Sequence, residues 1–174
     1  MVKEQCWTHL SEKQEPIIRR FLIYNSNVLR LTRFKIKKWR PIQERLWAKF
    51  CSNENKDEDH IFEKLLGKLK KDLIKVETNN KKFNEITQSK GSSFDHYYFK
   101  MSKEIKERLN KGKLISYPSG SYFDEACNFY GFEDPTFYKN DKMFGCYITH
   151  EGDVVLYLTK AQRKSLENKG VRFS

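Results

Sequence analysis

Residues 146–159 read CYITHEGDVVLYLT, and this stretch sets the expected fold of the C-terminal half. Two runs rich in β-branched and aromatic residues, 146–149 and 154–159, flank the polar segment Glu151-Gly152-Asp153. Such a pattern is typical of two antiparallel strands joined by a tight turn. We therefore expect a β-hairpin here, followed by a helix over residues 160–168 that ends at Gly170.

Four further elements are expected ahead of the hairpin. They are a helix from Ser102 to near Gly112, a short strand over residues 113–117, a helix over residues 121–131, and a helix that begins at Asp134-Pro135 and ends near Phe144. The residues between Thr78 and Ser93 are mostly polar, and the domain boundary is expected there.

This order of helix, strand, two helices and hairpin resembles the layout of winged-helix DNA-binding domains. Residues 126–137 also resemble a helix-turn-helix, with Ala126, Gly131 and Phe137 at its packing positions. The resemblance implies a winged-helix-like subdomain over residues 91–174. In it, the helix after Asp134 would bring Lys139, Asn140 and Lys142 to a DNA groove.

Residues 1–90 are expected to form a basic helical region, which makes the whole chain α+β. Pro16 begins a helix in which Ile18 and Leu22 share one face, and Pro41 begins another. Residues 28–39 fit either a helix or a strand, and we favour the helix.

Residues 61–76 carry an apolar side chain at every third or fourth position, which predicts an amphipathic helix. The apolar positions are Ile61, Phe62, Leu65, Leu66, Leu69, Leu73 and Val76. This stripe either packs on the rest of the domain or joins two copies of the chain into a homodimer.

Positive charge is concentrated in the N-terminal half. The chain holds 34 Lys and Arg against 23 Asp and Glu, a net charge of +11, and ten of the basic residues lie within residues 17–49 with only Glu44 opposing them. Such a segment attracts polyanions, because each phosphate that it neutralises releases condensed counterions. The expected phosphate contacts are Arg30, Arg33, Lys35, Lys37, Lys38, Arg40 and Arg45.

Motifs for other chemistry are missing from the sequence. Closely spaced Cys or His pairs, phosphate-binding loops and dinucleotide motifs are absent, so we expect neither a metal nor a cofactor. The four cysteines stand far apart, and the chain contains no apolar run long enough to span a bilayer. These features predict a cytoplasmic protein, or a nuclear one in a eukaryote, without a transmembrane segment.

Together these features predict a nucleic-acid-binding protein that catalyses no reaction, with DNA favoured over RNA. A regulator, or a replication or partition accessory of a mobile element, would fit its size and charge.

Two alternatives stay open. His150 beside Glu151 could serve a small basic ribonuclease or toxin, and a basic face could serve an inhibitor or immunity protein with an acidic partner. The aromatic run that contains Phe94, Tyr97, Tyr98 and Phe99 could likewise stack bases or pack in a core.

Overall fold

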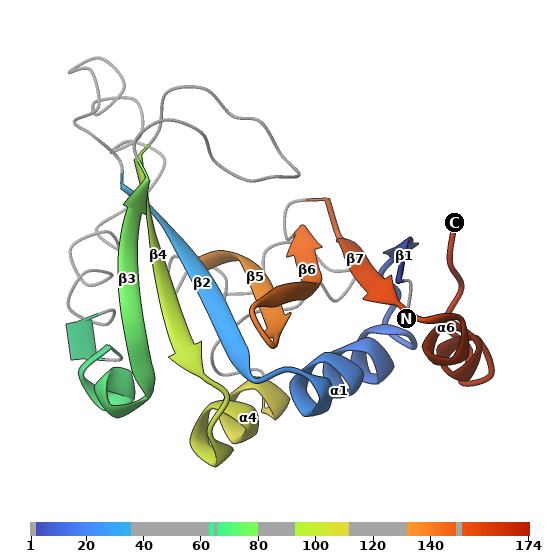
Figure 1. Cartoon of the computed structure of the whole chain (residues 1–174), viewed down its shortest axis with the longest axis horizontal. Helices are drawn as coiled ribbons and strands as arrows, with labels where there is room; N and C mark the ends of the chain where they lie inside the picture. Colours follow the sequence, from blue (N-terminus) through green and yellow to red (C-terminus); the bar gives the residue numbers. More distant parts are fainter. Residues whose placement is uncertain (1–2, 36–62, 65, 80–92, 112–131, 149–150) are drawn as a thin grey trace.

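The computed structural model describes residues 3–35, 63–64, 66–79, 93–111, 132–148 and 151–174. Seven antiparallel strands form one twisted sheet in the order β1-β7-β6-β5-β2-β4-β3 (Figure 1). The strands are β1 (Glu4–His9), β2 (Val28–Lys35), β3 (Leu73–Asn79), β4 (Ser93–Lys100), β5 (Phe132–Lys139), β6 (Lys142–Ile148) and β7 (Asp153–Leu158). The helices with both ends described are α1 (Glu15–Asn25), α4 (Lys103–Asn110) and α6 (Lys160–Glu167), with a short 3-10 turn, η1 (Lys70–Asp72). Described residues 63–64 and 66–69 are also helical, directly ahead of η1.

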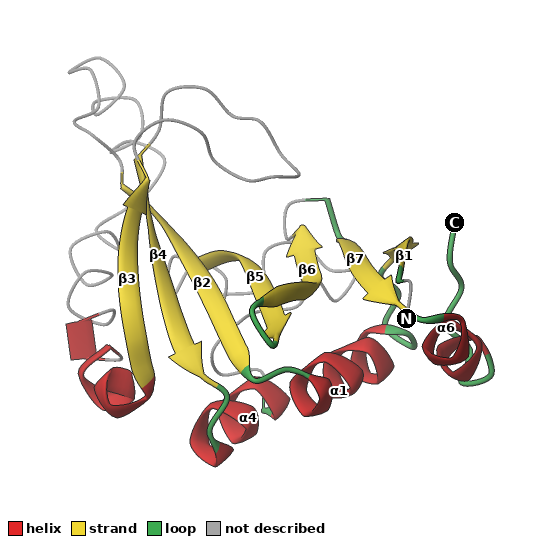
Figure 2. Cartoon of the chain, viewed as in Figure 1, coloured by secondary structure: helices red, strands yellow, loops and turns green. Residues whose placement is uncertain are grey.

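A helical N-terminal region followed by a winged-helix-like subdomain is therefore wrong, because the described residues form one seven-stranded antiparallel sheet with only short helices (Figure 2). Strand β2 lies within residues 28–39, for which the sequence favours a helix. Strand β3 replaces the end of the helix expected over residues 61–76, which stops at Leu69 before η1. The helix expected from Asp134 to Phe144 is instead the β5–β6 hairpin.

Backbone geometry and strand pairing both exclude a helix over residues 134–144. Asn140 and Asp141 adopt φ angles of 50° and 60°, the left-handed values that a two-residue type I′ hairpin turn requires. Pairing with β2 on one side and β7 on the other then satisfies backbone groups that a helix would have bonded internally.

Several local predictions are confirmed. Helix α1 begins with Pro16 in its first turn, and the Ser102 Oγ atom accepts a hydrogen bond from the Ile105 N–H (3.3 Å) at the start of α4. The β6–β7 hairpin forms with Gly152 at φ 71°, and a capping box built on Thr159 starts α6. The elements expected at Pro41, over residues 113–117 and over residues 121–131 lie outside the described residues.

One face of the sheet carries an apolar row that crosses all seven strands in register. Directly opposed residues on neighbouring strands share a face. The row consists of Cys6, Leu156, Gly145, Phe137, Leu29, Phe99 and Leu73. All but Leu73, which is half-buried, are fully buried. Burying each large side chain stabilises the fold by about 1.5–3 kcal/mol.

Helix α1 packs on this apolar row. A Cβ atom on Gly145 would lie 2.6 Å from Leu22 Cδ2 and 2.8 Å from Leu156 Cδ2, so glycine allows the helix to approach the sheet. Ile18, Leu22 and Ile23 of α1 are completely buried. Among the described residues, no helix has the length and apolar character needed to cross a membrane.

Gly145→Ala should destabilise the protein by about 1–3 kcal/mol, because the added methyl group overpacks the contact between α1 and the sheet. The measurement is the free energy of unfolding from urea titration followed by circular dichroism. Gly67→Ala is the matched control. A Cβ on the helical Gly67 meets no atom within 4 Å, so this change should leave stability equal or raised. Equal effects of the two changes would contradict the packing argument.

Candidate nucleic-acid interface

The face of the sheet opposite α1 carries a second row, which is apolar at one end and polar at the other. From β1 to β3 its members are Trp7, Val155, Cys146, Thr136, Arg30, Tyr98 and Lys75. Beside the polar end, on the same face, lie Tyr138, Thr32, His96 and Glu77. We call the eight residues Thr136, Arg30, Tyr98, Lys75, Tyr138, Thr32, His96 and Glu77 the polar patch.

Arg30 lies at the centre of the polar patch. Its Nη2 atom donates a hydrogen bond to Thr136 Oγ1 (2.9 Å), and its guanidinium carbon lies 5.8 Å from the centroid of the Tyr138 ring. Its Nε atom is buried without a hydrogen-bond partner. A buried donor without an acceptor costs about 1–3 kcal/mol, so this atom lowers the stability of the fold.

Aromatic rings and cations alternate across the patch. The Tyr98 and Tyr138 rings are 6.2 Å apart between centroids, and the Lys75 Nζ atom lies 4.5 Å from the Tyr98 centroid. Lys75 also pairs with Glu77 (2.6 Å). Burial, followed by a hydrogen bond to Glu77, raises the pKa of the Tyr98 phenol, so Tyr98 stays neutral and offers a planar uncharged face.

Two buried groups on this face, His96 of the polar patch and the neighbouring Cys146, are poorly suited to acid–base or nucleophilic chemistry near neutral pH. His96 Nδ1 is 3.0 Å from Thr32 Oγ1, and burial, helped by the charge of Arg30, lowers the pKa of His96 to about 4. Burial raises the pKa of the Cys146 thiol to about 11. Within the described ranges, His, Cys, Asp and Glu nowhere gather into a group of three or more that could hold a metal ion.

His96 predicts a pH dependence of stability. Its pKa is about 4 in the folded protein and about 6.5 when unfolded, so the unfolded state binds the extra proton first. The contribution to stability is therefore complete above pH 6.5 and is lost as the pH falls toward 4, by roughly 2–3 kcal/mol. Urea titrations at pH 7, 5.5 and 4.5 measure it. His96→Asn, which does not titrate, should show a smaller loss than wild type; an equal loss would contradict this assignment.

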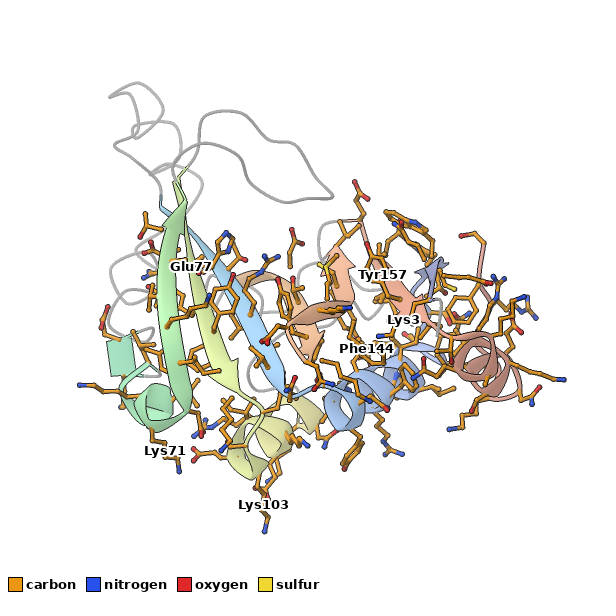
Figure 3. The ribbon with its side chains drawn as sticks, in the orientation of Figure 1. Lys3, Lys71, Glu77, Lys103, Phe144 and Tyr157 are labelled. Carbon is orange, nitrogen blue, oxygen red and sulfur yellow. The ribbon has the colours of Figure 1, made fainter. Side chains whose placement is uncertain are left out.

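The second candidate feature is a group of three exposed lysines, Lys3, Lys139 and Lys142, which we call the lysine cluster. Lys139 and Lys142 flank the β5–β6 turn, and Lys3 precedes β1. The Nζ atoms of Lys3 and Lys139 lie 4.9 Å and 5.9 Å from the centroid of the buried Phe144 ring (Figure 3). Partial burial, and then the charges of Lys139 and Lys142, lower the pKa of Lys3.

The lysine cluster is positioned by the backbone of the hairpin. The Asn140 N–H donates to Asn27 Oδ1 (3.1 Å), and the Asn27 N–H donates to the Tyr138 carbonyl (2.9 Å). The turn is thereby fixed to the connection between α1 and β2. None of the three lysines forms an ion pair with a carboxylate of the described residues. Because the three charges repel one another, an anion bound here would relieve the repulsion.

A groove beside α4 contains basic residues that are partly paired with acids. A groove of about 830 Å³ between η1 and α4 is lined by Lys71, Asp72, Ser102, Lys103, Glu104, Glu107, Arg108 and Lys111. Lys71 and Arg108 both contact Glu104 (2.7 Å and 3.0 Å), and Ser102 donates to Asp72 (2.7 Å). Two of the four basic side chains of the groove are thus already neutralised by Glu104.

The structure separates the residues expected to contact phosphate. Arg30 and Arg33 lie on opposite faces of β2, because their sequence separation is odd. Lys35 ends β2, and its side chain is outside the described set, as are Lys37, Lys38, Arg40 and Arg45. Lys139, Asn140 and Lys142 do come together, at a hairpin turn instead of on a recognition helix.

Sequence reasoning missed Lys3 and the second face of the sheet. Lys3 is far from Lys139 in sequence, and no pattern links the two. The aromatic run of β4 did contain a usable signal, because strand alternation sends Tyr97 and Phe99 to the helix-covered face and Tyr98 to the polar patch. Only Tyr98 of these three is thus available to the candidate interface.

Comparison with protein-family models, with curated proteins and with solved structures finds no match to this chain.

Proposed function

We propose that the protein binds nucleic acid, DNA before RNA, and that it acts by binding and not by catalysis. The observation that carries the proposal is the lysine cluster, in which three exposed ammonium groups gather and none forms an ion pair with a carboxylate of the described residues, although Asp141 lies in the turn between Lys139 and Lys142. Phosphate groups are the abundant partners of such unneutralised lysines, and the net charge of +11 adds a long-range attraction to a polyanion.

The polar patch supports the same proposal through a different chemistry. Tyr98 and Tyr138 offer planar faces, and Arg30 places a guanidinium beside the Tyr138 ring. Bases stack on tyrosine rings and on guanidinium planes, whereas phosphates accept hydrogen bonds from arginine. Contacts of this kind need no recognition helix, and they favour binding with little dependence on base sequence.

Lys139→Gln/Lys142→Gln should weaken nucleic-acid binding. Loss of two phosphate contacts should lower the magnitude of the slope of log K against log salt by about 2 on duplex DNA. The measurement is fluorescence anisotropy with duplex DNA, single-stranded DNA and RNA at several salt concentrations. Lys103→Gln/Lys111→Gln is the matched control, because it removes the same charge from exposed positions on and just after α4.

The outcomes separate the alternatives. Loss of affinity in the first variant and near wild-type affinity in the second support the lysine cluster as the interface. Equal losses would assign binding to overall charge. Absence of binding by the wild-type protein near physiological salt would overturn the proposal in favour of an acidic protein partner. A shortened probe on a gel would favour the ribonuclease, whose expected residue His150 lies outside the described residues.

The biological role as a regulator, or as a replication or partition accessory, stays a prediction from size and charge. A homodimer also stays a prediction. Its contact cannot be one continuous helix over residues 61–76, because residues 73–76 belong to β3.

A further inference from the structure

Strand β3 is an edge of the described sheet. It pairs with β4 on one side and ends the strand order, so no described strand pairs with its other side (Figure 1). An edge strand presents unpaired backbone N–H and C=O groups to any chain that can add to it. Natural edges are commonly protected by proline, by unpaired lysines, by a β-bulge or by a covering helix. Strand β3 contains no proline, and its pairing with β4 shifts register between Leu73 and Lys75, so residues 75–79 are its regular part.

The side chains of β3 are unusually apolar for an exposed edge. Ile74 and Val76 are 55% and 46% exposed, and with Tyr24 of α1 they are the large hydrophobic side chains found exposed in the described ranges. The single lysine that could repel another strand, Lys75, is neutralised by Glu77 at 2.6 Å. Exposed β-branched residues favour pairing with a further strand when the charges on the edge cancel, as those of Lys75 and Glu77 do.

The sequence of β3 is complementary to itself in one register. A two-fold axis perpendicular to the sheet lies midway between one residue of β3 and the same residue of the other copy, so that residue is paired with itself. With Val76 opposite Val76, Lys75 of each copy lies opposite Glu77 of the other, on the same face. Centring the pair on Lys75 or on Glu77 would instead place like charges directly opposite each other, which destabilises a strand pair.

We propose that the protein forms a homodimer in which the β3 strands of two copies pair antiparallel about Val76 and join the two sheets edge to edge. The interface is isologous, with two Lys75–Glu77 pairs on one face and Val76 packed against Val76 on the other. The polar patches of both copies lie on the same face of the joined sheet, because Lys75 is the last member of each row. This proposal does not depend on nucleic-acid binding.

The test is the molar mass of the purified full-length chain, measured by size-exclusion chromatography with light scattering from ~1 to ~100 µM. Wild type should reach twice 20.9 kDa. Lys75→Glu and Glu77→Lys should each weaken association at least ~10-fold, since each variant opposes like charges twice. Lys75→Glu/Glu77→Lys restores opposite charges in the same register and should restore the dimer. Circular dichroism checks that every variant is folded.

A wild-type chain that stays monomeric over this range would overturn the proposal, as would a dimer that is indifferent to both single charge reversals. Val76→Cys gives a second, independent measurement. Opposed Cα atoms in an antiparallel pair are about 4.5–5.5 Å apart, within the range of a disulfide. Val76→Cys should therefore form a covalent dimer on mild oxidation, whereas Tyr24→Cys, at the exposed position on α1, should not. Equal cross-linking of both would also refute the proposed register.

Discussion

The structure depends on the register that keeps seven strands aligned along one apolar row. Leu29 lies at its centre, opposed by Phe137 on β5 and by Phe99 on β4, and Gly145 on β6 leaves room for Leu22 of α1. A shift of one residue in β2 or β4 would exchange the two faces of that strand and bring Arg30 or Tyr98 to the apolar side. Every other feature follows from this alignment, because fixing the inner face also fixes which residues occupy the outer one.

The outer face of the sheet carries the side chains that this alignment keeps out of the apolar row. Arg30, Tyr98 and Lys75 are held on one face only because Leu29 and Phe99 are held on the other. The resulting neighbourhood is costly for charge, as the lowered pKa of His96 indicates. A fold does not need an arginine donor without an acceptor, or a buried neutral histidine, for packing alone. These departures from an apolar surface make the polar patch a candidate for binding.

The lysine cluster and the edge strand illustrate two kinds of unsatisfied surface. Among the described residues, Lys3, Lys139 and Lys142 form no ion pair, and β3 has no second strand partner. The lysine cluster can bind an anion, and the edge of β3 can bind a chain that offers matching backbone hydrogen bonds. Because they lie toward opposite ends of the sheet order, nucleic-acid binding and dimerisation can be tested separately and can occur together.

The sequence by itself determined the elements whose signals are local. Pro16 and the apolar spacing specify α1, Ser102 and Thr159 cap the next helices, and Gly152 specifies the last hairpin turn. Net charge likewise comes from composition. Tertiary structure alone decided that residues 28–35 and 132–139 are strands, since apolar residues at mixed spacings fit both periods until pairing partners supply the backbone hydrogen bonds. It also decided that Lys3 lies near Lys139, because that contact requires β1 and the β5–β6 turn to meet at one edge of the core, and no short-range pattern encodes such a meeting.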